Sequence, residues 1–529
     1  MQYNSYMYLF AFLIPVVILY YIIPIKYRWG VLLTASIVFY LFSSKYLIVS
    51  ILFTSLLVYL AAKNIEDRNL KFKEIKKSLE KPERKLLKEK NEKKNNLVCG
   101  LVAIISLGIL FFSKYLNFAG NIANSFCRLL NINMQFETVH LLMPLGISFY
   151  TLSAIAYVID VKRGVCEAEK KPLKIFLFLS FFPTVTEGPI ERYKNVGKML
   201  STGHSFDYKT FCFGLQLMMW GLFKKIVVAD NLNRYVMVVF RDYKNFGNWV
   251  IILMVLVYTL ELYADFSGCI DIARGSAELF GIELSENFKQ PFVSKTVNEF
   301  WQRWNITLGS FLRDYVFYPV SLSTGFQNLS KKSKKVFNNY YATTVPMIFA
   351  LFMVWLCNGL WHGSEVKYVV YGLYYYAILT LGLLLEPLFK KIFESLNINR
   401  ESKGYQRCQI ARTFILVNIG MMIFNSKDIA SAKEMFFAMF KPSAISNIPQ
   451  ELLNTGMQSP AMVLLFIIPV IIFAFVGHFH EQGISIREYL AQKPLFYRWS
   501  FYLAGVAVII SLGAYGVGFK GADFIYAQF

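Results

Sequence analysis

The stretch YMYLFAFLIPVVILYYII, Tyr6 to Ile23, contains no charged residue and no alternation of apolar and polar positions. A run of this length can cross a bilayer as a helix, because about 20 apolar residues match the hydrocarbon thickness. Lipid cannot hydrogen-bond an open backbone, and the strands of a membrane barrel would alternate. The run therefore predicts a transmembrane helix, and since it lacks a basic leader and a cleavage site, we expect it to be retained.

The same pattern recurs along the chain. Of the 529 residues, 56% are hydrophobic and 17% are charged, which is far more apolar than a soluble protein. We predict an all-α, polytopic membrane protein with about eleven transmembrane helices. The expected spans are Tyr6–Ile23, Trp29–Ser44, Tyr46–Ala62, Leu97–Ala119, Leu141–Val161, Trp249–Phe266, Ala342–Leu360, Val369–Leu385, Ile410–Phe424, Ala461–Gly477 and Tyr502–Phe519.

Two shorter apolar stretches, Ile175–Val185 and Phe211–Val228, are expected to be re-entrant or interfacial. Irregular backbone at membrane depth survives only when it is buried in protein or lines a cavity, so these pieces predict a cavity. The chain shows no repeat and no break in composition. We therefore expect one multi-helix domain over residues 1–529.

The net charge of +21 is spread between apolar runs, as the positive-inside bias produces, and does not indicate nucleic-acid binding. Lys63–Asn96 carries 13 Lys/Arg and 7 Asp/Glu, with Pro82 interrupting its helical pattern. We expect a basic cytoplasmic loop here, an N-terminus outside, and a multi-pass protein of the cell (plasma) membrane. The loop either faces anionic lipid or docks an acyl-carrier protein or the phosphates of CoA.

Five histidines are candidates for chemistry. His140 precedes a span, His204 lies in a polar loop, and His478 and His480 form an HxH pair after a span. Seven cysteines show no CxxC spacing, so neither they nor the HxH pair predict a metal site or a disulfide framework.

His362 alone sits between strongly apolar segments, in NGLWHG followed by VVYGLYYY. Asn358 and Gly359 precede it, and Trp361 and Gly363 flank it. A buried histidine is most often a hydrogen-bonded structural residue. An imidazole in a dry site is also the side chain best suited to take a proton near neutral pH, so both readings stay open.

A second region, TVNEFWQRWNITLGSFLRDYVFYPV, runs from Thr296 to Val320. Thr296 and Glu299 form a capping-box pattern, and the apolar residues that follow have helical spacing, which predicts one amphipathic helix. Its apolar stripe is Phe300, Trp304, Leu308, Phe311, Leu312 and Tyr315. Arg303, Arg313 and Asp314 lie off this stripe and Asn305 lies close to it, as in an interfacial helix with snorkelling arginines.

Upstream, Glu261 and Asp265 lie one helical turn apart, followed by Asp271 and Arg274. We expect the second pair to be a structural ion pair, because an unpaired charge at membrane depth is costly. Glu261 and Asp265 could form a paired-carboxylate site, or they could be satisfied by other donors.

These residues carry a resemblance to the membrane-bound O-acyltransferase family, in the bacterial branch of alginate O-acetylation and teichoic-acid D-alanylation. About half the chain takes part, with a core near residues 143–386. The matching segments are MPLGISFYTLSAIAYVIDVKRG (Met143–Gly164), FFPTVTEGPIERY (Phe181–Tyr193), WGLFKKIVVADNL (Trp220–Leu232), Tyr263–Val320 and Asn358–Tyr376.

The resemblance implies helices ringed around a central tunnel, with His362 as the general base. It implies an acyl group, most simply acetyl, passing from a cytoplasmic thioester such as acetyl-CoA to a hydroxyl of an envelope polysaccharide. No permanently bound cofactor is expected, and membrane lipid, an extracytoplasmic esterase-like partner and an acyl-carrier protein are the expected or candidate partners. The residues expected to line the substrate tunnel are Trp304, Arg303, Trp361, Asn358, Asp314 and Arg313.

One position departs from the family pattern. Bacterial relatives usually read RWHI or RWHM where this chain has Arg303–Ile306, so Asn305 replaces an expected second histidine. Asparagine can orient a substrate or hydrogen-bond an oxyanion, but it cannot act as a base. D-alanyl transfer, a transporter or flippase, and a catalytically degenerate scaffold therefore remain alternatives.

Overall fold

The computed structural model describes residues 1–137, 139, 142–337 and 339–515. These residues fold into helices joined by turns and longer loops and hold no β-strand, apart from an isolated bridge between Phe288 and Trp304. The all-α prediction is confirmed. His140, Leu141 and the end of the last predicted span, residues 516–519, lie outside the described residues.

Within the described part of the chain, eight helical runs are long and apolar enough to cross a membrane. They are Ile25–Ile75, Lys81–Lys114, Tyr208–Arg241, Asn248–Glu278, Asn339–His362, Val366–Ser395, Lys403–Asn425 and Leu495–Leu512. The chain is therefore a multi-pass membrane protein.

The number of these helical runs differs from the eleven predicted spans because some predicted spans share one run and others coincide with shorter helices. Trp29–Ser44 and Tyr46–Ala62 share the run Ile25–Ile75, and three other predicted spans coincide with shorter helices. Phe211–Val228 was expected to be re-entrant or interfacial, but it lies inside a continuous helical run that includes a π-helical segment, Phe223–Ala229. A π-helical segment holds one extra residue per turn and lets the helix continue. The re-entrant or interfacial position of this stretch stays a prediction. The number of spans and the ring around a tunnel stay predictions.

The described residues group into two compact units. One comprises Met1–Met218 and Ile272–Ser285, and the other comprises Met219–Asp271 and Glu286–Gln528. Helix α11 (Asn248–Glu278) contributes residues to both. The single-domain prediction stays a prediction.

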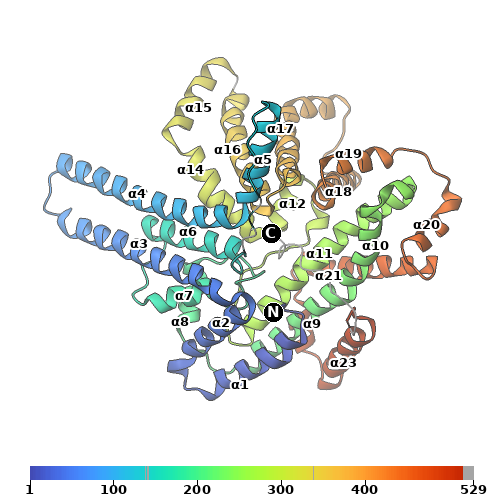
Figure 1. Ribbon diagram of the computed structural model, residues 1–529, viewed down its shortest axis with the longest axis horizontal. Helices are drawn as coiled ribbons and strands as arrows, with labels where there is room; N and C mark the ends of the chain where they lie inside the picture. Colours follow the sequence, from blue (N-terminus) through green and yellow to red (C-terminus); the bar gives the residue numbers. More distant parts are fainter. Residues whose placement is uncertain (138, 140–141, 338, 516–529) are drawn as a thin grey trace. The chain divides into compact units, whose positions relative to one another are not determined.

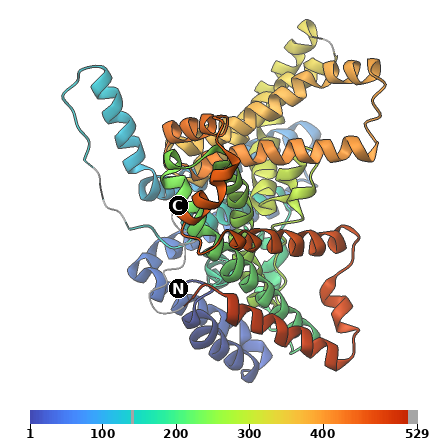
Figure 2. The same ribbon diagram turned by 90° about the vertical axis from the view of Figure 1, so that its right-hand side faces the viewer.

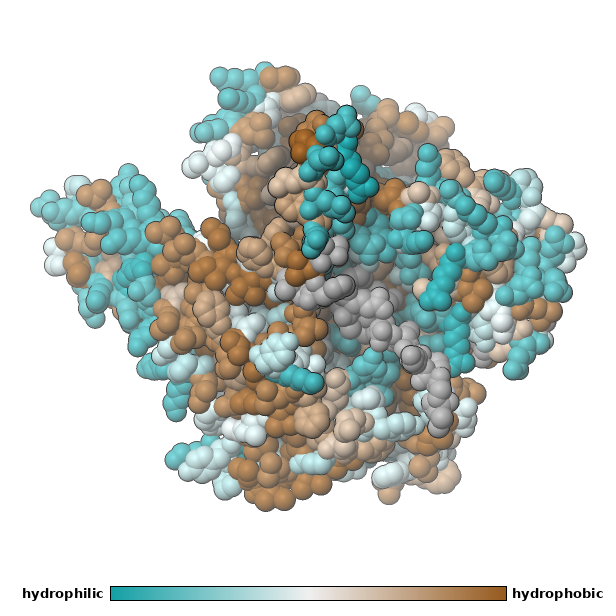
Figure 3. Space-filling model, viewed as in Figure 1, coloured by the Kyte–Doolittle hydropathy of each residue, from teal (hydrophilic) through white to brown (hydrophobic). Residues whose placement is uncertain are grey.

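In the first unit, the predicted basic loop is a helical hairpin. Helices α3 (Ile48–Ile75) and α4 (Lys81–Lys114) pack along each other and are joined by a short turn (Figure 1). Pro82 does not interrupt a helix but lies in the first turn of α4, where its missing N–H is not needed. The far end of the hairpin is mostly hydrophilic (Figure 3), as its lysines require.

In the second unit, α16 (Asn339–His362) and α17 (Val366–Ser395) pack along each other, and α18 (Lys403–Asn425) packs against α17 (Figure 2). Glycines let α16 and α17 come close. A Cβ added at Gly359 would lie 2.4 Å from the Tyr368 carbonyl oxygen, and one at Gly372 would lie 2.4 Å from that of Trp355. Small residues allow this approach in membrane helices, where dispersion rather than the hydrophobic effect drives packing.

The single amphipathic helix expected from Thr296 to Val320 is broken in two. Helix α12 (Val297–Arg303) ends before Trp304, and α13 (Ile306–Leu312) begins after Asn305, whose φ of 46° is left-handed. A π-helical turn, η7 (Arg313–Phe317), and the short helix α14 (Tyr318–Ser321) follow. Asparagine tolerates this conformation better than most residues. The expected cap is present, since the Thr296 hydroxyl accepts a hydrogen bond from the Glu299 N–H at 3.1 Å.

Candidate functional site

His362 is the last residue of α16 and is only 2% exposed. Its ring lies edge to face with three aromatic rings from three helices. The ring centroids are 5.1 Å from Trp361, 5.5 Å from Tyr371 on α17, and 5.3 Å from Phe424 on α18. Both ring nitrogens are buried. An aromatic shell of this kind fixes the ring plane and keeps bulk water away from the imidazole.

The glycines around His362 set the position of this shell. A Cβ added at Gly363 would lie 2.2 Å from the Tyr368 ring, so no larger residue fits there without a shift. Tyr368 in turn packs on Phe424, with ring centroids 5.2 Å apart. The motif NGLWHG therefore packs the end of α16 tightly against α17 and α18.

Asn358 and Trp361, two predicted tunnel residues, are both buried near His362. Asn358 lies one turn before His362 on α16, so the two side chains share a face of the helix. Trp361 contacts the imidazole directly. The structure thus brings these three residues together, and a tunnel-lining role for Asn358 and Trp361 stays a prediction.

Trp301 on α12 connects the Thr296–Val320 region to the His362 shell. Its ring centroid is 4.8 Å from Tyr375 and 6.2 Å from Tyr371, which itself contacts His362. Among the described residues its buried Nε1 has no hydrogen-bond partner. Sequence reasoning did not single out Trp301, Tyr371 or Phe424. The first two lie in quoted motifs and could have been found there, whereas no local signal marks Phe424.

Asn305 is 5% exposed and is held by a second asparagine. Its Oδ1 accepts a hydrogen bond from Nδ2 of Asn287 at 3.2 Å. Asn287 Oδ1 in turn accepts from the backbone N–H and the hydroxyl of Thr307, each at 2.9 Å. Within the described part of the chain, Nδ2 of Asn305 is buried without a hydrogen-bond partner. A buried unsatisfied donor is uncommon and costs stability unless something binds it.

Trp304 and Arg303, also predicted tunnel residues, make structural contacts. Trp304 is 1% exposed and stacks on Phe300, with centroids 5.4 Å apart and Phe288 against its edge. The Arg303 guanidinium pairs with Glu299 at 3.0 Å and with Glu481. Both residues therefore stabilise the bend at residues 303–306, and a role toward substrate stays a prediction.

Arg313 and Asp314 form an ion pair with each other, with 3.0 Å between Nε and Oδ1. They lie in η7, which packs against α16. The Arg313 side chain is 58% exposed. Their predicted tunnel-lining role stays a prediction.

The intramembrane carboxylates are organised by lysines that the sequence analysis did not assign. Lys225 Nζ lies 2.5 Å from Asp265 and 2.9 Å from Asp230, and all three side chains are buried. Glu261 Oε1 accepts a hydrogen bond from Asn233 at 3.1 Å. Glu261 and Asp265 thus each bind a distant donor through one oxygen, while Oε2 of Glu261 and Oδ2 of Asp265 are buried without a hydrogen-bond partner among the described residues.

Asp271 pairs with a lysine that the sequence analysis did not assign, Lys224, with 2.7 Å between Oδ2 and Nζ. Arg274 Nε donates to the Leu284 carbonyl at 3.4 Å. Burial strengthens the attraction between Lys224 and the carboxylate. The expected ion pair between Asp271 and Arg274 stays a prediction.

Three other histidines, all among the described residues, have ordinary partners. His480 pairs with Gln290 and His478 with Gln482, each at 3.0 Å. His204 pairs with the Met199 carbonyl at 2.9 Å. None of these three is drawn into the aromatic shell.

Comparison with known proteins bears on the same segments. The family model of MBOAT, the membrane-bound O-acyltransferase family, matches residues 168–422, a range that holds both His362 and Asn305. A protein of Pseudomonas syringae pv. tomato named probable alginate O-acetylase AlgI is 31% identical, over 64% of this chain and 60% of its own length. The chain thus spans less than two thirds of that relative.

Other relatives match over a larger share of their length. The protein of the same name from Pseudomonas putida is 31% identical over 70% of each chain. Teichoic acid D-alanyltransferase of Bacillus subtilis is 28% identical over 54% of this chain and 70% of its own length. This chain therefore belongs to the membrane-bound O-acyltransferase family.

Proposed function

We propose that this protein is an O-acyltransferase that moves an acyl group, most simply acetyl, from a thioester donor to a hydroxyl of a cell-envelope polysaccharide. The observation that carries the proposal is the position of His362, buried at the end of α16 within an aromatic shell from three helices. The names of the relatives support the reaction class and the type of acceptor.

In this mechanism His362 acts as the general base. A ring nitrogen takes the proton of the acceptor hydroxyl while that oxygen attacks the thioester carbonyl carbon. The tetrahedral intermediate then collapses, the C–S bond breaks, and the imidazolium returns the proton to the leaving thiolate. The aromatic shell favours transfer over hydrolysis because it keeps competing water from the thioester.

Asn305 fits the role of an electrostatic stabiliser. Its Nδ2 has no hydrogen-bond partner among the described residues, and its Oδ1 is fixed by Asn287. A donor held in this way is preorganised for a carbonyl oxygen that becomes negative in the transition state. Asn305 would therefore replace the expected histidine as a donor and not as a base.

The donor we propose is acetyl-CoA or another acyl thioester of the cytoplasm, with no permanently bound cofactor. An extracytoplasmic esterase-like partner would complete transfer to the glycan. D-alanyl transfer from a carrier protein is the second candidate, and the Bacillus subtilis relative favours it. The basic hairpin of α3 and α4 supports a cytoplasmic position for that end and an N-terminus outside, in the plasma membrane.

Membranes that contain the protein, its envelope acceptor and its extracytoplasmic partner test the proposal with labelled acetyl-CoA or a D-alanyl carrier. We expect label in the polysaccharide for the wild type and a loss of at least about 100-fold for His362→Ala. Asn305→His should retain transfer if the position needs only a donor. Normal transfer by His362→Ala at equal protein level would refute the catalytic assignment and leave a flippase or a scaffold.

A further inference from the structure

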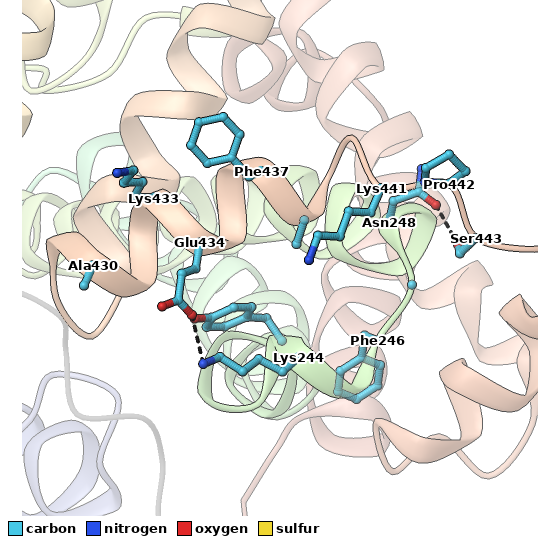
Figure 4. A pocket seen from close by; sticks show the side chains of 13 residues that line it. Lys244, Phe246, Asn248, Ala430, Lys433, Glu434, Phe437, Lys441, Pro442 and Ser443 are labelled. Carbon is cyan, nitrogen blue, oxygen red and sulfur yellow. Dashed lines mark hydrogen bonds and ion pairs between the residues drawn. The ribbon is translucent and has the colours of Figure 1, made fainter.

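A pocket of about 840 Å³ lies in the second unit, and none of the three rings around His362 lines it (Figure 4). Two segments form it. One is residues 243–248, at the start of α11, and the other is α19 (Ile429–Ala438) with the residues that follow it to Ser443. None of the residues singled out in the sequence lines this pocket.

Hydrogen bonds between the two segments hold the pocket open. Tyr243 donates to Glu434 at 2.6 Å, and Ser443 donates to Asn248 at 2.6 Å. Gly247 leaves no room for a side chain, since an added Cβ would lie 2.5 Å from the Ser443 hydroxyl oxygen. The walls are therefore in place before any ligand binds, which lowers the cost of binding.

The charge of the pocket is positive. Lys244, Lys433 and Lys441 line it together with one carboxylate, Glu434. That carboxylate is occupied by Tyr243 and by an ion pair with Lys244 at 2.9 Å (Figure 4). The hydrogen bond from Tyr243, followed by Lys244, lowers the pKa of Glu434, so it stays ionised and keeps neutralising Lys244. Lys433 and Lys441, both exposed, supply the remaining positive charge.

The pocket also offers surfaces that suit a sugar ring. Phe246 and Phe437 line it, and the Ser443 hydroxyl and the Asn248 amide lie beside them. An aromatic face packs against the C–H face of a sugar, while hydroxyl and amide groups exchange hydrogen bonds with its hydroxyls. A purely phosphate-binding site would not need the aromatic rings, and a neutral sugar would not need the lysines.

The pocket is tied to the end of the helices where His362 lies. Phe424, which contacts His362, precedes the short connection into α19. Lys367, at the start of α17, donates to the Ser426 carbonyl at 3.1 Å within that connection. A chain bound along the pocket would therefore lie at the same end of α16, α17 and α18 as the base.

Resting on the proposed function, we propose that this pocket binds an anionic stretch of the acceptor polysaccharide, bearing carboxylate or phosphate groups, beside the hydroxyl to be acylated. Lys433 and Lys441 attract the charge of the glycan. Phe246 and Phe437 pack on its rings. The pocket then holds the polymer near His362 between successive transfers.

Binding to the purified full chain, measured by fluorescence anisotropy without any acyl donor, tests this inference separately from catalysis. The labelled probes are alginate oligomers for carboxylates, glycerol-phosphate oligomers for phosphates, and neutral dextran oligomers of similar length. We expect one or both anionic probes to bind, more weakly at higher salt, and dextran not to bind. Equal binding of dextran, or no binding of either anionic probe, would overturn the inference.

The double variant Lys433→Gln/Lys441→Gln should weaken binding of the anionic probe about tenfold. The matched control is Lys331→Gln/Lys332→Gln on α15 (Thr324–Val336), which removes the same charge from exposed positions that do not line the pocket. An equal loss in both variants would show that only overall charge matters, and would refute the pocket. If no glycan binds, but a glutamate-rich peptide binds the wild type and not the Lys433→Gln/Lys441→Gln variant, the pocket would be assigned to a protein partner instead.

Discussion

Replacing Gly372 with alanine should lower acyl transfer without touching any group that reacts. An added Cβ at Gly372 would lie 2.4 Å from the Trp355 carbonyl oxygen and 3.3 Å from Cα of Gly359, whereas ordinary contact begins at 3.4 Å. The obstructing atoms are backbone, so the side chains cannot simply turn aside. Helices α16 and α17 must therefore separate by about 1 Å at this crossing.

The separation acts directly on His362, the proposed base. Tyr371 precedes Gly372 and contacts the imidazole of His362, which ends α16 just after Gly359. A displacement of about 1 Å between a catalytic group and its substrate costs about 100-fold in rate. We expect a loss of that size in label transfer from the acyl thioester, measured in membranes and divided by the amount of folded protein.

Gly382→Ala is the matched control. Gly382 lies on the same helix, α17, but an added Cβ there meets nothing within 4 Å. Alanine also favours helix more than glycine does, so this variant should transfer at the wild-type rate. Wild-type transfer by Gly372→Ala at equal protein level would refute the argument that close packing positions His362.

Two further predictions concern stability. Lys225→Met should leave Asp265 and Asp230 buried without their cation and lower the free energy of unfolding by about 3–5 kcal/mol, which is measured as a lower thermal unfolding midpoint in detergent. Adding Asp265→Asn to this variant should restore part of the midpoint. If the midpoint is not restored, the pairing of Lys225 with Asp265 is contradicted. Burial raises the pKa of Glu191, although the Ser285 backbone N–H at 2.6 Å opposes the shift. The folded chain then holds that proton to higher pH than the unfolded chain, so stability falls as pH rises from the ordinary glutamate value to the folded one. The Glu191→Gln side chain cannot ionise, so the unfolding midpoint of this variant should fall less than that of the wild type between about pH 5 and pH 8. If the variant and the wild type show the same pH dependence, Glu191 is excluded as the cause of the fall.

The helices and the burial of His362 could be predicted from local sequence because both depend on near neighbours. Long apolar runs can satisfy their backbone in lipid only as helices, and each predicted span overlaps a helix in the part of the chain that the structure describes. His362 stood out because Gly359, Trp361 and Gly363 surround it within a few residues.

The break at Asn305 could not be read in the same way, because a distant residue determines it. The apolar spacing from Phe300 to Leu312 fits one helix, and those residues are buried as expected. The decisive contact comes from Asn287, 18 residues earlier. The Asn287 side chain caps α13 by accepting a hydrogen bond from the Thr307 N–H. The Asn287 backbone carbonyl accepts a hydrogen bond from the Ile306 N–H at 3.1 Å.

The same reasoning applies to the buried lysines and bears on the proposed chemistry. Lys225 reaches Asp265 across 40 residues of sequence, and no helical periodicity could indicate that partner. Asn305 differs from Lys225 in one respect, because it keeps a buried donor with no partner among the described residues. Leaving the buried amide of Asn305 without a partner lowers the stability of the folded chain. That loss is understandable if the donor is kept for a group that is present only during the reaction.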